Sequence, residues 1–145
     1  MLADTTDIAH LIQSSVAPVF LLTGVAATLG VLTTRLARIV DRARVLEARL
    51  ESHPERAAHL HEDLKVLARR AGYINIAISL CAIAALMVAA VVVTLFANAF
   101  FGLKIGWLIA LLFVGSLVVL SAAFIAFFVE VRYATSVLRI GMEHR

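Results

Sequence analysis

The sequence predicts an all-α membrane protein with three transmembrane helices and a cytoplasmic antiparallel helical hairpin between the first and the second. The observations behind this fold are the composition, three long uncharged runs and the distribution of the cationic residues. Of the 145 residues, 62% are hydrophobic and 16% are charged, and the mean hydropathy is +0.97. Ordinary soluble domains contain about 45–50% apolar and about 25% charged residues. The composition therefore excludes a soluble globular domain, and we treat residues 1–145 as a single membrane domain.

The uncharged runs cover residues 8–34, 71–103 and 105–129. Each is longer than the roughly 20 residues that an α-helix needs to cross a bilayer. None shows the alternation of apolar and polar residues that is typical of β-strands. We therefore place the three spans, in chain order, at residues 15–34, 71–97 and 106–129.

The cationic residues predict the orientation of these spans. Nine of the 13 lysines and arginines lie within residues 35–70, three lie in the tail at residues 130–145, and Lys104 is the only other one. Because cytoplasmic loops carry an excess of Lys and Arg, residues 35–70 and the tail are expected in the cytoplasm, with the N-terminus and the Lys104 turn outside. The excess of basic over acidic residues thus reflects membrane topology, and we expect no nucleic-acid partner.

The N-terminal segment is expected to lie at the outer membrane interface. Residues 1–7 contain no Lys or Arg, whereas a cleavable signal peptide begins with a positive charge. We therefore expect the N-terminus to be retained, with residues 1–14 as an interfacial segment. Pro18 removes one backbone hydrogen bond, which predicts a kink or a break in the helix there.

Residues 35–70 carry two heptad seams that mirror each other about a turn at residues 52–55. Apolar residues recur at alternating spacings of three and four on both sides of this turn, as in an antiparallel coiled coil. Such a hairpin is either a rigid linker between two spans or a docking surface for a cytoplasmic partner. Its predicted seam consists of Leu36, Ile39, Leu46, Leu50, Leu60, Leu64 and Leu67, with alanines at 43, 57 and 71.

The same register places Arg38 beside Arg69, a contact between like charges close to the membrane. Anionic lipid headgroups or a nearby carboxylate would make this contact favourable. Glu130, directly after the third span, is the available carboxylate. We expect it to form an interfacial ion pair with Arg35, Arg69 or Arg70.

A polar stripe follows one side of the first helix. At about 100° per residue, Thr6, Ala17 and Arg42 share this side with five candidates for lining a pore. Polar side chains that face lipid are costly, so the stripe must face other helices or water. Both alternatives remain open, namely close helix packing and a pore shared by several copies. The pore-lining candidates are His10, Gln13, Gly24, Thr28 and Arg35.

The second span has a small residue at every fourth position, namely Ala77, Cys81, Ala85 and Ala89. Small residues at this spacing are typical of close helix packing in membranes. Cys81 is the only cysteine, so an internal disulfide is impossible.

No motif for catalysis, metal binding or cofactor binding is evident. The sequence contains no nucleophile and base arrangement, no phosphate-binding glycine loop and no zinc signature. His53, His59 and His61 cluster near the hairpin tip, but His59 and His61 do not have the i, i+4 spacing that places two ligands on one helix face. We expect neither an enzyme nor a resident metal or cofactor.

Residues 16–24 (VAPVFLLTG) and 32–44 (LTTRLARIVDRAR) resemble the domain of unknown function 2721, a family of small bacterial membrane proteins. The length and the layout of three spans suit this family over nearly the whole chain. The resemblance implies a bacterial source and a multi-pass protein of the inner (plasma) membrane. It implies no activity and no catalytic residue.

Two hypotheses about function follow. A homo-oligomer could carry ions along an axial path lined by the first helix, because three helices alone can hardly enclose such a path. Alternatively, the protein is a non-conducting scaffold or adaptor whose hairpin docks a cytoplasmic protein, and the polar stripe serves packing. In both cases membrane lipid is an expected partner.

Overall fold

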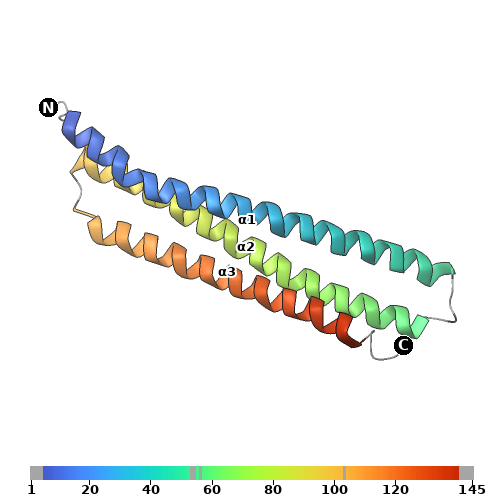
Figure 1. Cartoon of the computed structure of the whole chain (residues 1–145). Helices are drawn as coiled ribbons and strands as arrows, with labels where there is room; N and C mark the ends of the chain where they lie inside the picture. The colour runs from blue at the N-terminus through green and yellow to red at the C-terminus, as the bar shows by residue number, and fades with distance from the viewer. Residues whose placement is uncertain (1–4, 53–54, 56, 103, 141–145) are drawn as a thin grey trace. The chain divides into compact units, whose positions relative to one another are not determined.

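The computed structural model describes residues 5–52, 55, 57–102 and 104–140. This part of the chain contains the helices α1 (Thr5–Ser52), α2 (Ala57–Phe101) and α3 (Gly106–Ile140) (Figure 1). Each helix includes a segment that is long and apolar enough to cross a membrane. The predicted all-α class and the three spans are therefore confirmed.

The α1 helix continues without a break through Pro18, which is buried. Of the two predicted outcomes, the break was therefore wrong, and the kink stays a prediction. The proline removes one backbone donor, whereas breaking the helix would leave several backbone groups without partners in an apolar surrounding. The uninterrupted helix is thus the less costly solution, and it joins the predicted interfacial segment to the first span.

The helices also continue through the charged segment between the first two spans. The α1 helix runs past Arg35 to Ser52, and α2 begins at Ala57, well before the apolar run that starts at Ala71. His53, Pro54 and Arg56 lie outside the described residues, and so does half of the predicted turn at residues 52–55. The cytoplasmic hairpin itself stays a prediction.

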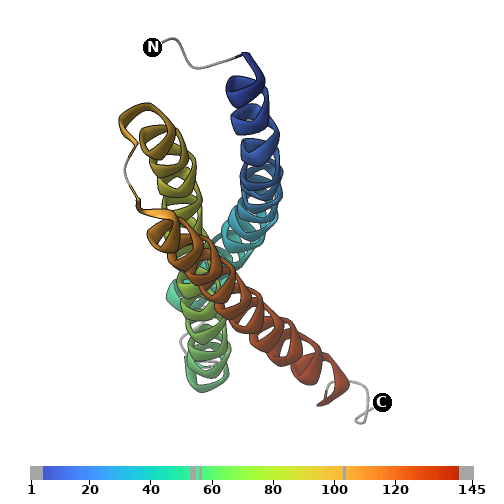
Figure 2. The ribbon, with the colours of Figure 1, turned by 90° about the vertical axis from the view of Figure 1, so that its left-hand side faces the viewer.

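The connection between α2 and α3 is short, as Figure 2 shows. The α2 helix ends at Phe101, and Gly102 follows with a φ of +63°. A left-handed residue directly after a helix is a common helix stop, and glycine adopts this conformation without a steric penalty. The backbone N–H of Ile105 donates to the side-chain oxygen of Asn98 over 3.4 Å, which ties the start of α3 to the end of α2.

Two compact units divide the chain, each with part of every helix. One comprises Met1–Leu29 and Leu80–Ser121, and the other comprises Gly30–Ser79 and Ala122–Arg145. The core of the first unit is apolar apart from Ser116, whose hydroxyl donates to the carbonyl of Phe113 over 2.7 Å. The core of the second unit includes the buried carboxylate of Glu130.

Buried residues recur at a period of seven in each helix. A seven-residue period keeps one narrow face of a helix buried along its length. The α2 helix carries two such series, three residues apart. The series are Val25, Leu32 and Ile39 in α1, Ile74, Cys81 and Val88 with Ala77, Ala84 and Val91 in α2, and Ser116, Ala123 and Glu130 in α3.

This period differs from the small-residue spacing of four that the sequence suggested for the second span. Ala77 and Cys81 are buried, but Ala85 is half-buried and Ala89 is exposed. A strict spacing of four rotates by about 40° at each step, because an α-helix has 3.6 residues per turn. The face defined by these residues therefore leaves the core, whereas alternating steps of three and four remain in it.

Large apolar side chains are exposed on all three helices. The exposed fraction is 74% for Phe20, 71% for Leu86 and 65% for Ile125. In water so many exposed apolar groups would favour aggregation. In a bilayer the same side chains contact lipid, which agrees with a multi-pass membrane protein.

The contact between Gly115 and Met87 gives a first prediction. A Cβ atom added at Gly115 would lie 2.7 Å from the terminal methyl of Met87. We expect Gly115→Leu to lower the free energy of unfolding in detergent by about 1–3 kcal/mol through overpacking. Gly115→Ala should cost less, because the end of a methionine side chain is flexible.

The matched control is Gly30→Leu in α1, since an added Cβ meets nothing within 4 Å there. Thermal unfolding of the purified protein, followed by circular dichroism, measures the difference. Equal effects at the two glycines would contradict this packing.

Candidate functional site

A cluster of charged residues lies where the three uncharged runs end. Arg35 is the first charged residue after the run of α1, Arg70 is the last before the run of α2, and Glu130 is the first after the run of α3. All three belong to the compact unit formed by Gly30–Ser79 and Ala122–Arg145. Three positions that are distant in the sequence thus meet in one cluster.

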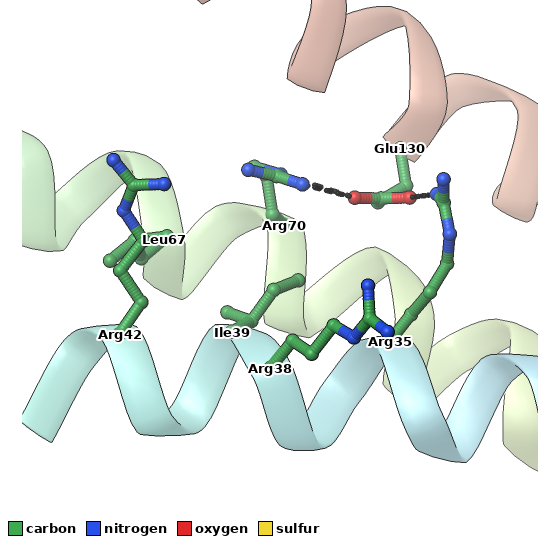
Figure 3. A pocket seen from close by; sticks show the side chains of 7 residues that line it. All are labelled: Arg35, Arg38, Ile39, Arg42, Leu67, Arg70 and Glu130. Carbon is green, nitrogen blue, oxygen red and sulfur yellow. Dashed lines mark hydrogen bonds and ion pairs between the residues drawn. The ribbon is translucent and has the colours of Figure 1, made fainter.

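The carboxylate of Glu130 lies between the guanidinium groups of Arg35 and Arg70 (Figure 3). Arg35 donates from Nη1 to Oε2 over 2.7 Å. Arg70 donates to Oε1 from Nε over 3.1 Å and from Nη2 over 2.9 Å. Both carboxylate oxygens are therefore occupied by charge-assisted hydrogen bonds, which are stronger than neutral ones.

Glu130 is fully buried, while the side chains of Arg35 and Arg70 are 39% and 24% exposed. Burying a carboxylate is unfavourable unless hydrogen bonds and opposite charges replace the lost water. Here Arg35 and Arg70 supply the hydrogen bonds and the positive charges. Among the described residues, no buried side-chain nitrogen or oxygen lacks a hydrogen-bond partner.

Aromatic side chains surround the ion pairs. The guanidinium carbon of Arg35 lies 5.1 Å from the ring centroid of Phe127, within the range of a cation–π contact. Tyr73 of α2 and Tyr133 of α3 stack with their ring centroids 5.6 Å apart and an interplanar angle of 13°. Tyr73 lies three residues after Arg70, and Tyr133 lies three residues after Glu130. The stacked rings therefore join α2 to α3 near the ion pairs.

Glu130 also lies beside a pocket of about 240 Å³, to which α1 contributes the most residues. We call this the arginine pocket. The other acidic residues of the described chain do not line it, so four guanidinium groups face one carboxylate. Its lining residues are Arg35, Arg38, Ile39, Arg42, Leu67, Arg70 and Glu130.

Arg38 and Arg42 differ from the other two arginines of this pocket. Both are exposed, and neither forms an ion pair with any carboxylate in the ranges that the structure covers. Figure 3 shows both on one stretch of α1, with the side chain of Arg42 beside Leu67 and that of Arg38 turned toward Arg35. The pocket therefore has an excess of positive charge that no ion pair among the described residues neutralises.

The pore-lining candidates of the sequence do not gather in this pocket, apart from Arg35. His10, Gln13 and Gly24 are exposed on α1, and Thr28 is half-buried. The hydroxyl of Thr28 donates to the carbonyl of Gly24 over 2.9 Å, so it is satisfied within its own helix. Arg35 is held by Glu130 and Phe127. That these residues line a pore stays a prediction.

The predicted seam residues are less exposed than their neighbours. Ile39 and Leu67 are buried, and Leu36, Leu46, Leu50, Leu60 and Leu64 are half-buried. Arg69 is exposed, and in the described chain the pairs with Glu130 come from Arg35 and Arg70. The facing pairs of the seam, including Arg38 with Arg69, stay a prediction.

Sequence reasoning did not find the arginine pocket, although a signal was present. Arg35, Arg38 and Arg42 are spaced by three and four residues, which places them on one side of a helix. The contacts of Arg35 with Phe127 and of Tyr73 with Tyr133 had no such signal, because they join helices that are far apart in the sequence. Within the described residues no group of three or more His, Cys, Asp or Glu side chains could hold a metal ion.

Comparison with known proteins places the chain in a family. A family model described as a protein of unknown function, DUF2721, matches residues 15–140. The chain belongs to the DUF2721 family. This match covers α2, α3, α1 from residue 15 onward and the arginine pocket of this DUF2721 protein. No curated protein and no solved structure matches the chain.

The ion pairs give a second prediction. Glu130→Gln removes the charge that holds Arg35 and Arg70 together, and we expect it to lower the free energy of unfolding. Breaking a buried pair typically costs about 3–5 kcal/mol, and the partial exposure of both arginines reduces our expectation to about 1–3 kcal/mol. Arg35→Gln and Arg70→Gln should each cost less, because the carboxylate then keeps one partner.

Glu47→Gln is the control, since Glu47 is an exposed carboxylate on α1. Thermal unfolding in detergent compares the four variants with the wild type. Indistinguishable stability of Glu130→Gln and Glu47→Gln would show that the buried pairs do not hold the helices together.

Proposed function

We propose that this DUF2721 protein is a homo-oligomer of the bacterial inner membrane, and that its first helices line an axial path for ions. In this proposal the N-terminus lies outside, and the C-terminus and the arginine pocket face the cytoplasm. The protein is not an enzyme. The observation that carries the proposal is the polar stripe of α1, on which His10, Gln13 and Gly24 are exposed.

At Gly24 the stripe lies off the buried face of α1. Gly24 on the stripe is exposed, whereas its neighbour Val25 is buried in the chain's own core. The amide of Gln13 forms no side-chain hydrogen bond within the described part of the chain. A polar group in or near hydrocarbon needs a polar partner or water, and a second copy of the chain can provide either.

Positive charge at the cytoplasmic end of the path agrees with this arrangement. Arg42 continues the stripe beyond Arg35, and it is exposed. Rings of charged side chains at the mouth of a pore select ions by their sign. A ring of arginines contributed by several copies would favour anions over cations.

Ion flux through reconstituted protein tests this proposal. We expect wild-type protein in liposomes to pass ions, with Gln13→Leu and Thr28→Leu each reducing the flux about tenfold. A tenfold change corresponds to about 1.4 kcal/mol, a reasonable cost for replacing one polar lining group by an apolar one. The measurement is the decay of an imposed ion gradient, followed with an ion-sensitive dye.

Thr23→Leu is the matched control for Thr28→Leu. Thr23 is also exposed on α1, its hydroxyl donates to a carbonyl of its own helix, and it lies off the stripe. Wild-type protein that passes no ion would contradict conduction. Equal effects of Thr23→Leu and Thr28→Leu would contradict a path along the stripe.

One observation favours a second candidate function, that of a non-conducting scaffold or adaptor. The α1 helix continues to Ser52 and α2 begins at Ala57, so both extend far beyond the charged residues at the ends of the apolar runs. Helices of this length outside a membrane present a large surface to a cytoplasmic protein.

Replacing residues 44–62 by a short flexible linker separates this candidate from conduction. If the protein is an adaptor, we expect the truncated form to lose co-purified proteins while its spans remain folded. An unchanged set of co-purified proteins would contradict the adaptor function. Unchanged ion flux in the same variant would assign conduction to the spans alone.

A further inference from the structure

We propose that the arginine pocket binds a phosphate group, and that the source of this phosphate is the headgroup of an anionic phospholipid. The proposal depends neither on ion conduction nor on the number of copies. It is carried by the charge imbalance of the pocket, by the geometry of Glu130 and by the position of the pocket at the ends of the apolar runs.

The charge imbalance is the first argument. Four arginines line the pocket with one carboxylate. Both oxygens of Glu130 already accept hydrogen bonds from Arg35 and Arg70, at distances of 2.7–3.1 Å. This carboxylate therefore cannot also neutralise Arg38 and Arg42. An anion in the pocket would reduce the repulsion among the four guanidinium groups.

The chemistry of the side chains favours phosphate. A guanidinium group presents its N–H donors in a planar fork that matches two oxygens of a phosphate. Arg38 and Arg42 are exposed, so their donors are available to a ligand. A pocket of about 240 Å³ has room for about eight waters at roughly 30 Å³ each, and a phosphate with its first ester carbons needs less.

The position of the pocket favours a lipid as the source. Arg35, Arg70 and Glu130 are the charged residues next to the three apolar runs, so the pocket is expected at the level of the headgroups. Ile39 and Leu67 form buried apolar walls. On the membrane side, Val31 and Phe128 are 54% and 60% exposed and can contact acyl chains. A soluble phosphate would gain nothing from these apolar groups.

Native mass spectrometry of the full-length protein in detergent tests the proposal. The protein is titrated with phosphatidylglycerol and, separately, with phosphatidylcholine of the same acyl chains. We expect wild-type protein to bind phosphatidylglycerol about 30-fold more tightly, because two basic residues near a charged headgroup contribute about one kcal/mol each, and about 1.4 kcal/mol is a factor of ten. The double variant R38Q/R42Q should lose this preference. R38K/R42K keeps the positive charges but lacks the planar guanidinium donors, so it should retain only part of the preference for phosphatidylglycerol.

The matched control is R44Q/R49Q, which removes two exposed charges from the same helix outside the pocket. It should keep the full preference for phosphatidylglycerol. In a second arm, inorganic phosphate and glycerol phosphate are titrated against thermal unfolding of the same proteins.

Each outcome of these titrations either supports or overturns the lipid site. Phosphatidylglycerol binding that depends on Arg38 and Arg42, together with weak effects of the soluble phosphates, supports the lipid site. Soluble phosphates that stabilise the wild type but not R38Q/R42Q, with no lipid preference, support a phosphate site and overturn the lipid source. If R38Q/R42Q and R44Q/R49Q bind every ligand alike, the pocket is not an anion site.

Discussion

The structure of one compact unit depends on a buried carboxylate held between two arginines. Glu130 has no access to solvent, so its charge is tolerable only while Arg35 and Arg70 remain in place. Each of the three residues comes from a different helix, so the ion pairs constrain all three helices at once. A shift of any helix by one turn, about 5.4 Å, would leave a charge without its partner.

The same constraint explains why a charged residue takes a core position. Glu130 lies seven residues after Ala123 and fourteen after Ser116, in the buried series of α3. An apolar residue there could be equally stable, because the gain from a buried ion pair seldom exceeds the cost of removing its charges from water. What the carboxylate adds is a specific register, since apolar faces alone permit a helix to slide by a heptad. We infer that Glu130 sets the register in which the apolar runs end together.

Much of the architecture could be predicted from the sequence, because lipid imposes simple rules on length and charge. The uncharged runs predicted the three helices, and the heptad seams of residues 35–70 predicted helical structure beyond the spans. Pro18 does not break α1, since the cost of one lost hydrogen bond is smaller than the cost of exposing a broken helix. The small-residue spacing in α2 was also a poor guide, because it rotates away from the core by Ala89.

The candidate site was only partly accessible to such reasoning. A lone glutamate after a span suggests an ion pair with nearby arginines, but the choice between Arg69 and Arg70 depends on the rotation of α2. The pocket that contains Arg38 and Arg42 requires three helices to be placed together. Contacts of this kind join residues separated by 60 and 95 positions, and no local pattern encodes them.

The central claim is that the ion pairs mark one membrane boundary shared by all three helices. Spin labels at Val31, Ile76 and Ile125, each a short distance on the apolar side of Arg35, Arg70 or Glu130, measure it directly. All three positions are exposed, and Cys81→Ala gives a background without other cysteines. The account predicts that power saturation in lipid bilayers places the three labels within hydrocarbon at depths that agree to about one helical turn, roughly 5 Å. A label in water, or two labels whose depths differ by about two turns or more, would contradict it.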